Sequence, residues 1–157
     1  MTSELSGNQK RKMKSAARLF AVQALYQMEQ SGQTFDQVRF EFLDHRCGEV
    51  FEDYEMLEGD VARFSELLEQ AVNHQALVDQ MTDRALVAKW PLGRIDSTLR
   101  ALFRAAGAEL TQTDTPPKVV IVEFVQVAQA FFPEGKEGNF VNAVLDHMAR
   151  EAKPDAF

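Results

Sequence analysis

The chain has 157 residues, of which 45% are hydrophobic, including 12 Phe. That length favours one domain, or two subdomains that share a core, and it is large enough to fold without disulfides. The single cysteine, Cys47, excludes an intramolecular disulfide and indicates a reducing compartment. No apolar run approaches the ~20 residues of a membrane helix, and the N-terminal segment lacks the apolar region of a signal peptide. We therefore expect a cytoplasmic protein without membrane contact.

The net charge of −7 conceals an uneven distribution of charge along the chain. Between Leu5 and Met28 there is no acid, and five bases gather there: Lys10, Arg11, Lys12, Lys14 and Arg18. From Glu29 to Asp83 there are 14 acids and three bases. The basic segment either contacts nucleic acid or only solubilises the chain. The acidic stretch is either a solvated surface or a docking site for a basic partner.

The N-terminal half is predicted to be helical after a disordered lead-in over residues 1–10. A helix is expected from Arg11 to Ser31, with Gly32 as its stop signal. Its apolar residues recur at helical spacing, and Arg11, Lys14 and Arg18 form a separate stripe three and four residues apart. Cations near a helix N-terminus are unfavourable by about 0.3–1 kcal/mol each, so this stripe breaks a local rule and suggests an anion site.

Further helices are expected from Phe35 to Leu43 and from Val61 to about Val87, the second one broken near Asn73. The intervening segment, His45 to Gly59, is either a loop or a weak helix. Trp90 to Gly93 contains a proline and a glycine, which interrupt a helix. This interruption divides the chain into an N-terminal half, residues 11–89, and a C-terminal half, residues 94–150, followed by a tail over residues 151–157.

In the C-terminal half we expect a helix from Arg94 to Leu110, a polar connector, and a helix that starts with Thr115 as N-cap and Pro116 as first residue. The run Val119–Phe132 begins with residues typical of a strand. However, its polar residues recur every third position, which favours a nearly buried helix. After a turn at Pro133–Gly138, the last helix runs from Asn139 to Ala152, with an Asp146–Arg150 pair. The predicted fold class is all-α.

Residues that would support catalysis or metal binding are scarce. The three histidines lie in different expected elements, and only His45 and Cys47 are close enough in sequence to suggest a metal pair. A loop histidine beside an idle cysteine explains that pair equally. No phosphate-binding glycine loop, nucleophile elbow or zinc-protease motif is present. We expect no enzyme, no cofactor and no metal.

Three segments together resemble one known family. They are Ala21–Tyr26 (AVQALY) after basic residues, Leu99–Leu110 (LRALFRAAGAEL), and Lys118–Glu123 (KVVIVE) leading to Phe140–Asp146 (FVNAVLD). In this order and spacing they resemble the NusB transcription-antitermination factors over about residues 11–150. Ala143, Ala108 and Asn139 depart from the usual family residues. A NusB-like domain also begins some rRNA cytosine methyltransferases, but this length leaves no room for a methyl-transfer domain.

The resemblance implies two packed helical subdomains of about seven helices. It also implies antitermination by binding single-stranded boxA RNA of ribosomal RNA leader transcripts, together with the ribosomal protein NusE, within the transcription elongation complex. The RNA-binding residues that it implies are Lys10, Arg11, Lys12, Lys14, Arg18, Lys136 and Asn139. Tyr26 carries over as a contact for the protein partner.

Several residues keep a structural interpretation beside the functional one. Arg104 and Glu109 are expected to hold helices together. Asn142 either bonds a neighbouring helix or touches RNA, and Trp90 is either a core anchor or a platform for a base. The alternative function is a protein-interaction adaptor whose acidic half holds a basic partner without direct RNA contact.

Overall fold

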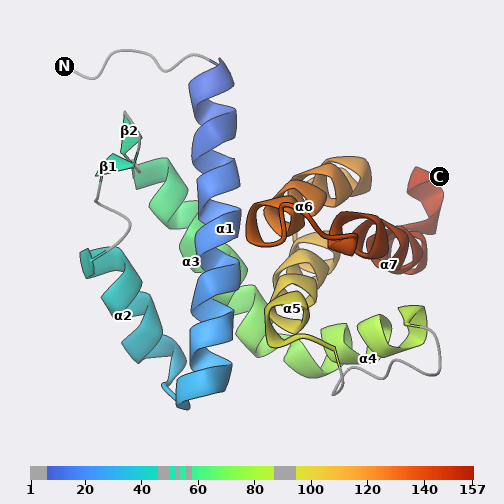
Figure 1. The fold of residues 1–157 in the computed structure, drawn as a ribbon, viewed down its shortest axis with the longest axis horizontal. Coiled ribbons are helices and arrows are strands. Elements are labelled where there is room, and N and C mark those ends of the chain that lie inside the picture. The colour runs from blue at the N-terminus through green and yellow to red at the C-terminus, as the bar shows by residue number, and fades with distance from the viewer. Residues whose placement is uncertain (1–6, 46–49, 52–53, 56–57, 87–94) are drawn as a thin grey trace.

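The computed structural model describes residues 7–45, 50–51, 54–55, 58–86 and 95–157. Within these residues it contains seven α-helices, one pair of two-residue strands and a C-terminal 3-10 turn (Figure 1). The elements are α1 (Gly7–Ser31), α2 (Phe35–His45), β1 (Val50–Phe51), β2 (Tyr54–Glu55), α3 (Glu58–Asn73), α4 (Gln75–Ala85), α5 (Ser97–Gln112), α6 (Pro117–Phe131), α7 (Glu137–Ala152) and η2 (Pro154–Ala156). The all-α prediction is confirmed.

The helix α5 lies at the centre of the fold and packs against α1, α3, α4, α6 and α7. The long helix α1 runs beside α3 and α5, and its buried residues join one continuous hydrophobic core. Aromatic rings close the core on the α2 and α3 side, where Phe42 stacks on Phe64 with ring centroids 5.6 Å apart. Because α1 is in contact with four other helices, more of its circumference is buried than its sequence periodicity suggested.

One expectation for the N-terminal half needs correction. The helix α1 begins at Gly7, so residues 7–10 of the expected disordered lead-in are helical, while residues 1–6 lie outside the described part. The expected end is confirmed, because Gly32 has a φ of 75° and its amide donates to the carbonyl oxygen of Met28. In the segment left open as loop or weak helix, Val50 pairs with Glu55 and Phe51 with Tyr54 in an antiparallel ladder.

The break expected near Asn73 is confirmed, because α3 ends at that residue and α4 starts at Gln75. Although α4 precedes the expected boundary, it packs against α5 and α7 of the C-terminal half. The boundary segment with Trp90 lies outside the described residues. The division into halves at residues 89 and 94 therefore stays a prediction.

In the C-terminal half, the helical interpretation of Val119–Phe132 is confirmed by α6, and the strand alternative is wrong. The expected cap is wrong by one residue, since Pro116 is the N-cap residue and Pro117 the first residue of α6. The helix α7 begins two residues earlier than expected. Its Asp146–Arg150 pair is present, with Nε and Oδ2 2.9 Å apart.

Candidate nucleic-acid interface

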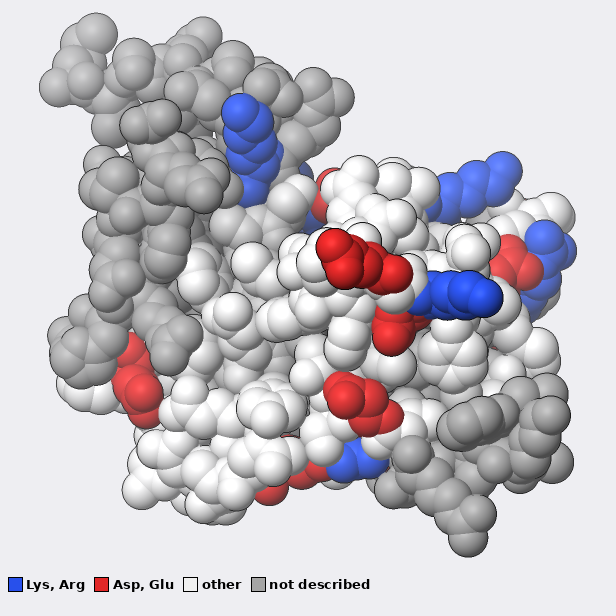
Figure 2. All heavy atoms as spheres, in the orientation of Figure 1, with Lys and Arg blue, Asp and Glu red and all other residues white. Residues whose placement is uncertain are grey.

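The basic segment lies on the first turns of α1. Lys12 and Lys14 have exposed side chains, whereas the side chains of Lys10 and Arg11 lie outside the described residues. Because α1 begins at Gly7, only Lys10 falls in its first turn, where the helix dipole acts most strongly. Figure 2 shows basic side chains at this end of α1 and again over α6 and α7, with acidic side chains between the two areas. A further basic patch lies lower in the view among acidic side chains, so the basic side chains on this face lie in several separate places.

Arg18 lies in a different environment from the exposed lysines. Its side chain is only 3% exposed, and its guanidinium donates through Nε and Nη2 to both carboxylate oxygens of Glu109, at 2.8 and 2.7 Å. The expectation that Arg18 belongs to a solvent-facing stripe is wrong. The physical reason is that α5 and α6 pack against this side of α1 and supply the acidic partners.

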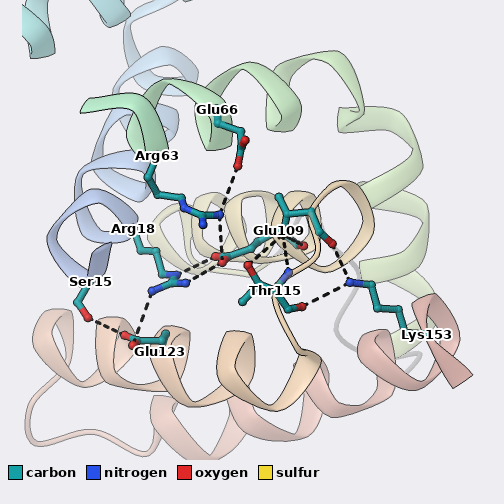
Figure 3. A network of polar contacts seen from close by, with 9 residues as sticks. Ser15, Arg18, Arg63, Glu66, Glu109, Thr115, Glu123 and Lys153 are labelled. Atoms are coloured by element: carbon teal, nitrogen blue, oxygen red, sulfur yellow. Dashed lines mark hydrogen bonds and ion pairs between the residues drawn. The ribbon is translucent and has the colours of Figure 1, made fainter. Parts of the chain in front are cut away.

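Arg18 belongs to a wider network that joins α1, α3, α5 and α6, shown in Figure 3. We call it the Arg18 network, and its members are Ser15, Arg18, Arg63, Glu109 and Glu123. Glu123 accepts a hydrogen bond from the Ser15 hydroxyl at 2.8 Å, and its Oε1 lies 3.6 Å from Nη1 of Arg18. Nη1 of Arg63 lies 3.8 Å from Oε2 of Glu109. Two basic and two acidic side chains of this network thus balance one another, and Glu66 is a further acid 3.3 Å from Arg63.

Arg18 and Glu109 stabilise each other's charge. Burial opposes ionisation of Glu109, but hydrogen bonds from Arg18 and Thr115 and the charges of Arg18 and Arg63 outweigh it, which holds the pKa of Glu109 below its ordinary value. Burial likewise opposes the charge of Arg18, and Glu109 and Glu123 more than compensate, so the pKa of Arg18 is raised. Both groups are therefore charged at neutral pH.

A second cluster of ion pairs joins the C-terminal end of α1 to α4 and α5. Arg104 pairs with Asp79 at 3.0 Å and with Glu29 at 2.8 Å, and Arg100 also contacts Glu29. Glu109 and Arg104 thus both connect helices, as expected from the sequence. The hydrogen bond from Arg100 outweighs the effect of burial and lowers the pKa of Glu29.

The other two expected RNA contacts lie where α7 begins. Lys136 is the N-cap residue of α7 and makes no capping hydrogen bond with its side chain, and Asn139 lies in the first turn. Both side chains are exposed. A helix N-terminus favours anions, so an exposed lysine at this position adds to a local preference for phosphate.

Tyr26 lies farther along α1, on the rim of a cavity of about 460 Å³ between α1, α2, α5 and α6. Its side chain is 40% exposed. Gln23, one turn earlier, turns its Oε1 into the interior, where it has no hydrogen-bond partner among the described residues. Tyr26 is therefore accessible at the surface beside this cavity.

The described part of the chain contains no cluster typical of a metal site and no helix typical of a membrane span. Its histidine, cysteine and acidic side chains form no group of three or more that could hold a metal ion. The side chains of His45 and Cys47 lie outside that part. No described helix is both long and apolar enough to cross a membrane.

Comparison with known proteins identifies the family. The model of the NusB family matches residues 15–150, which include nearly all of the core and every member of the Arg18 network. The chain belongs to the NusB family. It is 45% identical over 157 residues to the transcription antitermination protein NusB of Maricaulis maris, covering 99% of this chain and 98% of that protein. The NusB of Caulobacter vibrioides is 43% identical over 150 residues, covering 95% and 99%.

Solved NusB structures have the same fold. A crystal structure of T. maritima NusB superposes with a TM-score of 0.74 at 27% identity, covering 92% of this chain and 96% of that one. NusB in a complex with NusE and double-stranded RNA superposes with a TM-score of 0.72 at 22% identity, covering 89% and 98%. At 22% identity, the similarity to the NusB chain of that complex establishes the fold alone.

The partners of Arg18 were not predicted from the sequence. Glu123 was interpreted as part of a wet stripe because it recurs in register with Gln126 and Gln129. The sequence did contain one signal for a buried ion pair. It was a single acid within a long apolar run, together with a base at helical spacing from buried alanines. Arg63 gave no such signal, since it lies in an acidic segment in which a surface ion pair is the ordinary expectation.

Proposed function

We propose that this NusB-family chain is a transcription antitermination factor that binds RNA together with the ribosomal protein NusE. The observation that carries the proposal is its similarity, over nearly the full length of both chains, to proteins named for antitermination. A NusB structure that shares this fold holds both NusE and RNA. The two exposed lysines of α1 supply cations of the kind that phosphates require.

The proposed RNA surface consists of Lys10, Arg11, Lys12 and Lys14 on α1 and of Lys136 and Asn139 at the start of α7. Arg18, which the family resemblance placed among the RNA contacts, is proposed to hold α1 in place. Its guanidinium already donates to both oxygens of Glu109, so contact with phosphate would require breaking a buried pair. Tyr26 is proposed as a contact for NusE.

The finer features of the proposal follow the family resemblance. The RNA is single-stranded boxA of ribosomal RNA leader transcripts, and the site of action is the elongation complex in the cytoplasm. The chain is proposed to act by binding, without catalysis, cofactor or metal.

A ternary titration tests the function. Fluorescent boxA RNA is titrated with the chain, with and without NusE, and we expect weak binding by the chain alone and tighter binding with NusE. If about four phosphates are neutralised, log K should fall against log salt with a slope near −3. Absence of an RNA signal in both titrations, with binding of NusE retained, would instead support an adaptor that holds a basic partner.

The double variant Lys12→Ala/Lys14→Ala should bind RNA with a shallower salt dependence. Each lost phosphate contact changes the slope by about 0.7 for single strands, so two contacts should change it by about 1.4. The measurement is fluorescence anisotropy over a range of salt concentrations. Arg39→Ala, which removes an exposed cation on α2, is the control and should leave the slope unchanged. An equal slope in the double variant would place the RNA elsewhere.

Replacing Tyr26 with Ala should weaken NusE binding by about tenfold or more, because buried aromatic anchors dominate protein interfaces. RNA binding by the chain alone should stay as in the wild type. The control is Phe40→Ala, which removes an aromatic side chain that is 70% exposed on α2. Calorimetric titration with NusE gives the affinities, and equal losses in both variants would contradict a specific role for Tyr26.

A further inference from the structure

A second cavity opens directly beside the exposed lysines. It has a volume of about 620 Å³ and lies between α1, α3, the C-terminal end of α5 and the start of α6. Lys14 forms part of its wall, so the cavity is continuous with the proposed RNA surface. Arg18 and Arg63 also line it, and the Arg18 network holds these two side chains in place.

The charges of this cavity do not favour phosphate. Its lining contains three bases (Lys14, Arg18 and Arg63) and three acids (Glu66, Asp114 and Glu123), so they sum to zero. Arg18 is paired with Glu109 and Glu123, and Arg63 lies 3.3 Å from Glu66. An anion entering the cavity would meet the carboxylates of the lining, while Arg18 and Arg63 are already paired with acids. A neutral ligand with polar edges fits this lining better.

The remaining wall has the groups that such a ligand needs. Pro116 and Val119 provide an apolar surface, and the side chain of Val119 is 42% exposed. The carboxylate of Asp114 forms no hydrogen bond or ion pair with another described residue, and the Oε1 of Gln112 accepts none from them. An apolar wall beside solvent-accessible hydrogen-bond acceptors that no described side chain occupies matches the face and the N–H edge of a nucleobase.

We propose that this cavity receives one unpaired base of the RNA whose phosphates lie on Lys12 and Lys14. The inference rests on the proposed RNA-binding function. It adds a site with which the protein recognises the base sequence of the RNA. Lysines recognise phosphates, which position an RNA without specifying its sequence, so specificity requires a site for a base edge. The cavity is that site: Val119 packs against the face of the base, and Asp114 accepts from its N–H groups.

The test combines a change in the RNA with a change in the cavity. A series of fluorescein-labelled boxA RNAs is prepared, each with one abasic site at a different position. Their affinities are measured in the presence of NusE. In the wild type, one position should lose about tenfold in affinity when its base is absent, as expected for one well-made base contact. Val119→Phe, which fills the cavity, should bind intact RNA about tenfold more weakly and be insensitive to the abasic site at that position.

Matched variants separate the cavity from general damage to the fold. Val122→Phe makes the same change on the same helix at an exposed position that does not line the cavity, and it should behave as the wild type. Asp114→Asn should reduce the abasic effect, whereas Asp155→Asn on the exposed η2 should not. The salt slope should stay unchanged in all four variants, because they leave the phosphate contacts in place.

The outcomes distinguish this inference from the function on which it rests. Failure of the wild type to bind RNA, alone and with NusE, would overturn both. RNA binding that depends on Lys12 and Lys14, with the same abasic profile in the wild type and in Val119→Phe, would overturn the cavity alone. A loss of affinity in Val122→Phe equal to that in Val119→Phe would also overturn it, because the effect would then belong to the surface of α6.

Discussion

Replacing Glu109 with Gln is expected to lower the free energy of unfolding by about 3–5 kcal/mol. The carboxylate is fully buried and accepts two hydrogen bonds from Arg18, so the variant removes the main acidic partner of a buried guanidinium and leaves it only the longer contact with Glu123. Equilibrium unfolding in urea measures the change, and the midpoint should fall without a large change in slope. A loss below about 1 kcal/mol would mean that water or another acid compensates Arg18.

The double variant Arg18→Met/Glu109→Met provides the control. Apolar side chains of similar volume replace a buried ion pair with little loss, so this variant should be considerably more stable than Glu109→Gln. If the double variant unfolds as easily as the single one, the loss in the single variant comes from packing.

The same pair makes a prediction about pH. Because the folded chain holds the pKa of Glu109 below its ordinary value, the pair contributes stability above the unfolded pKa of about 4.3 and loses it as the pH falls through the folded pKa. The stability difference between the wild type and Glu109→Gln should therefore be constant near neutral pH and shrink in acid. A difference that stays constant down to strongly acidic pH would contradict the charged pair.

Replacing Gly107 with Ala should lower the free energy of unfolding by about 1–3 kcal/mol. A Cβ atom at this position would lie 2.3 Å from Cγ1 of Val78 and 3.2 Å from Cε of Met148, both fully buried. Valine has one strongly preferred rotamer in a helix, so the methyl group cannot turn away freely, and α4 must move from α5. The better helix propensity of alanine, worth up to about 1 kcal/mol, does not offset this overlap.

Two further variants test the cause of that loss. Adding Val78→Ala to Gly107→Ala removes the overlapping methyl group, so the two losses should sum to more than the loss in the double variant. Gly138→Ala is the matched control, because the nearest atom to its Cβ, at 3.3 Å, belongs to the flexible side chain of Gln129. It should change the stability by less than about 1 kcal/mol, as expected for a substitution that a flexible neighbour accommodates. Strictly additive losses would contradict a clash between α4 and α5.

Most helices were predictable because the pattern that marks them is local. The segment of α6 illustrates this, since four consecutive β-branched residues suggested a strand, while the spacing of Glu123, Gln126 and Gln129 predicted a helix. Helix ends were less predictable. The start of α1 at Gly7 and the cap at Pro116 each differ from the sequence prediction, because several residue types are compatible with the ends.

The candidate site was predictable only for residues whose exposure follows from their own helix. Lys12, Lys14, Lys136 and Asn139 were expected on the surface, and they lie there. The cavity beside Lys14 could not be predicted, because its lining comes from segments as distant as Lys14 and Glu123. No local sequence pattern predicts how the ends of α5 and α6 pack against α1.

The basic segment of α1 shows most clearly what the sequence determines and what the tertiary structure determines. The sequence alone shows that five cations lie close together without an acid between them. Helical periodicity then predicts how they are spaced around the helix. The fold then divided them, because Arg18 meets Glu109, which is 91 residues away, while Lys12 and Lys14 stay exposed. Helix formation depends on neighbours in the chain, but the environment of a charge depends on which helices pack around it. That packing leaves the lysines as candidates for RNA and makes Arg18 the buried cation that joins α1 to α5.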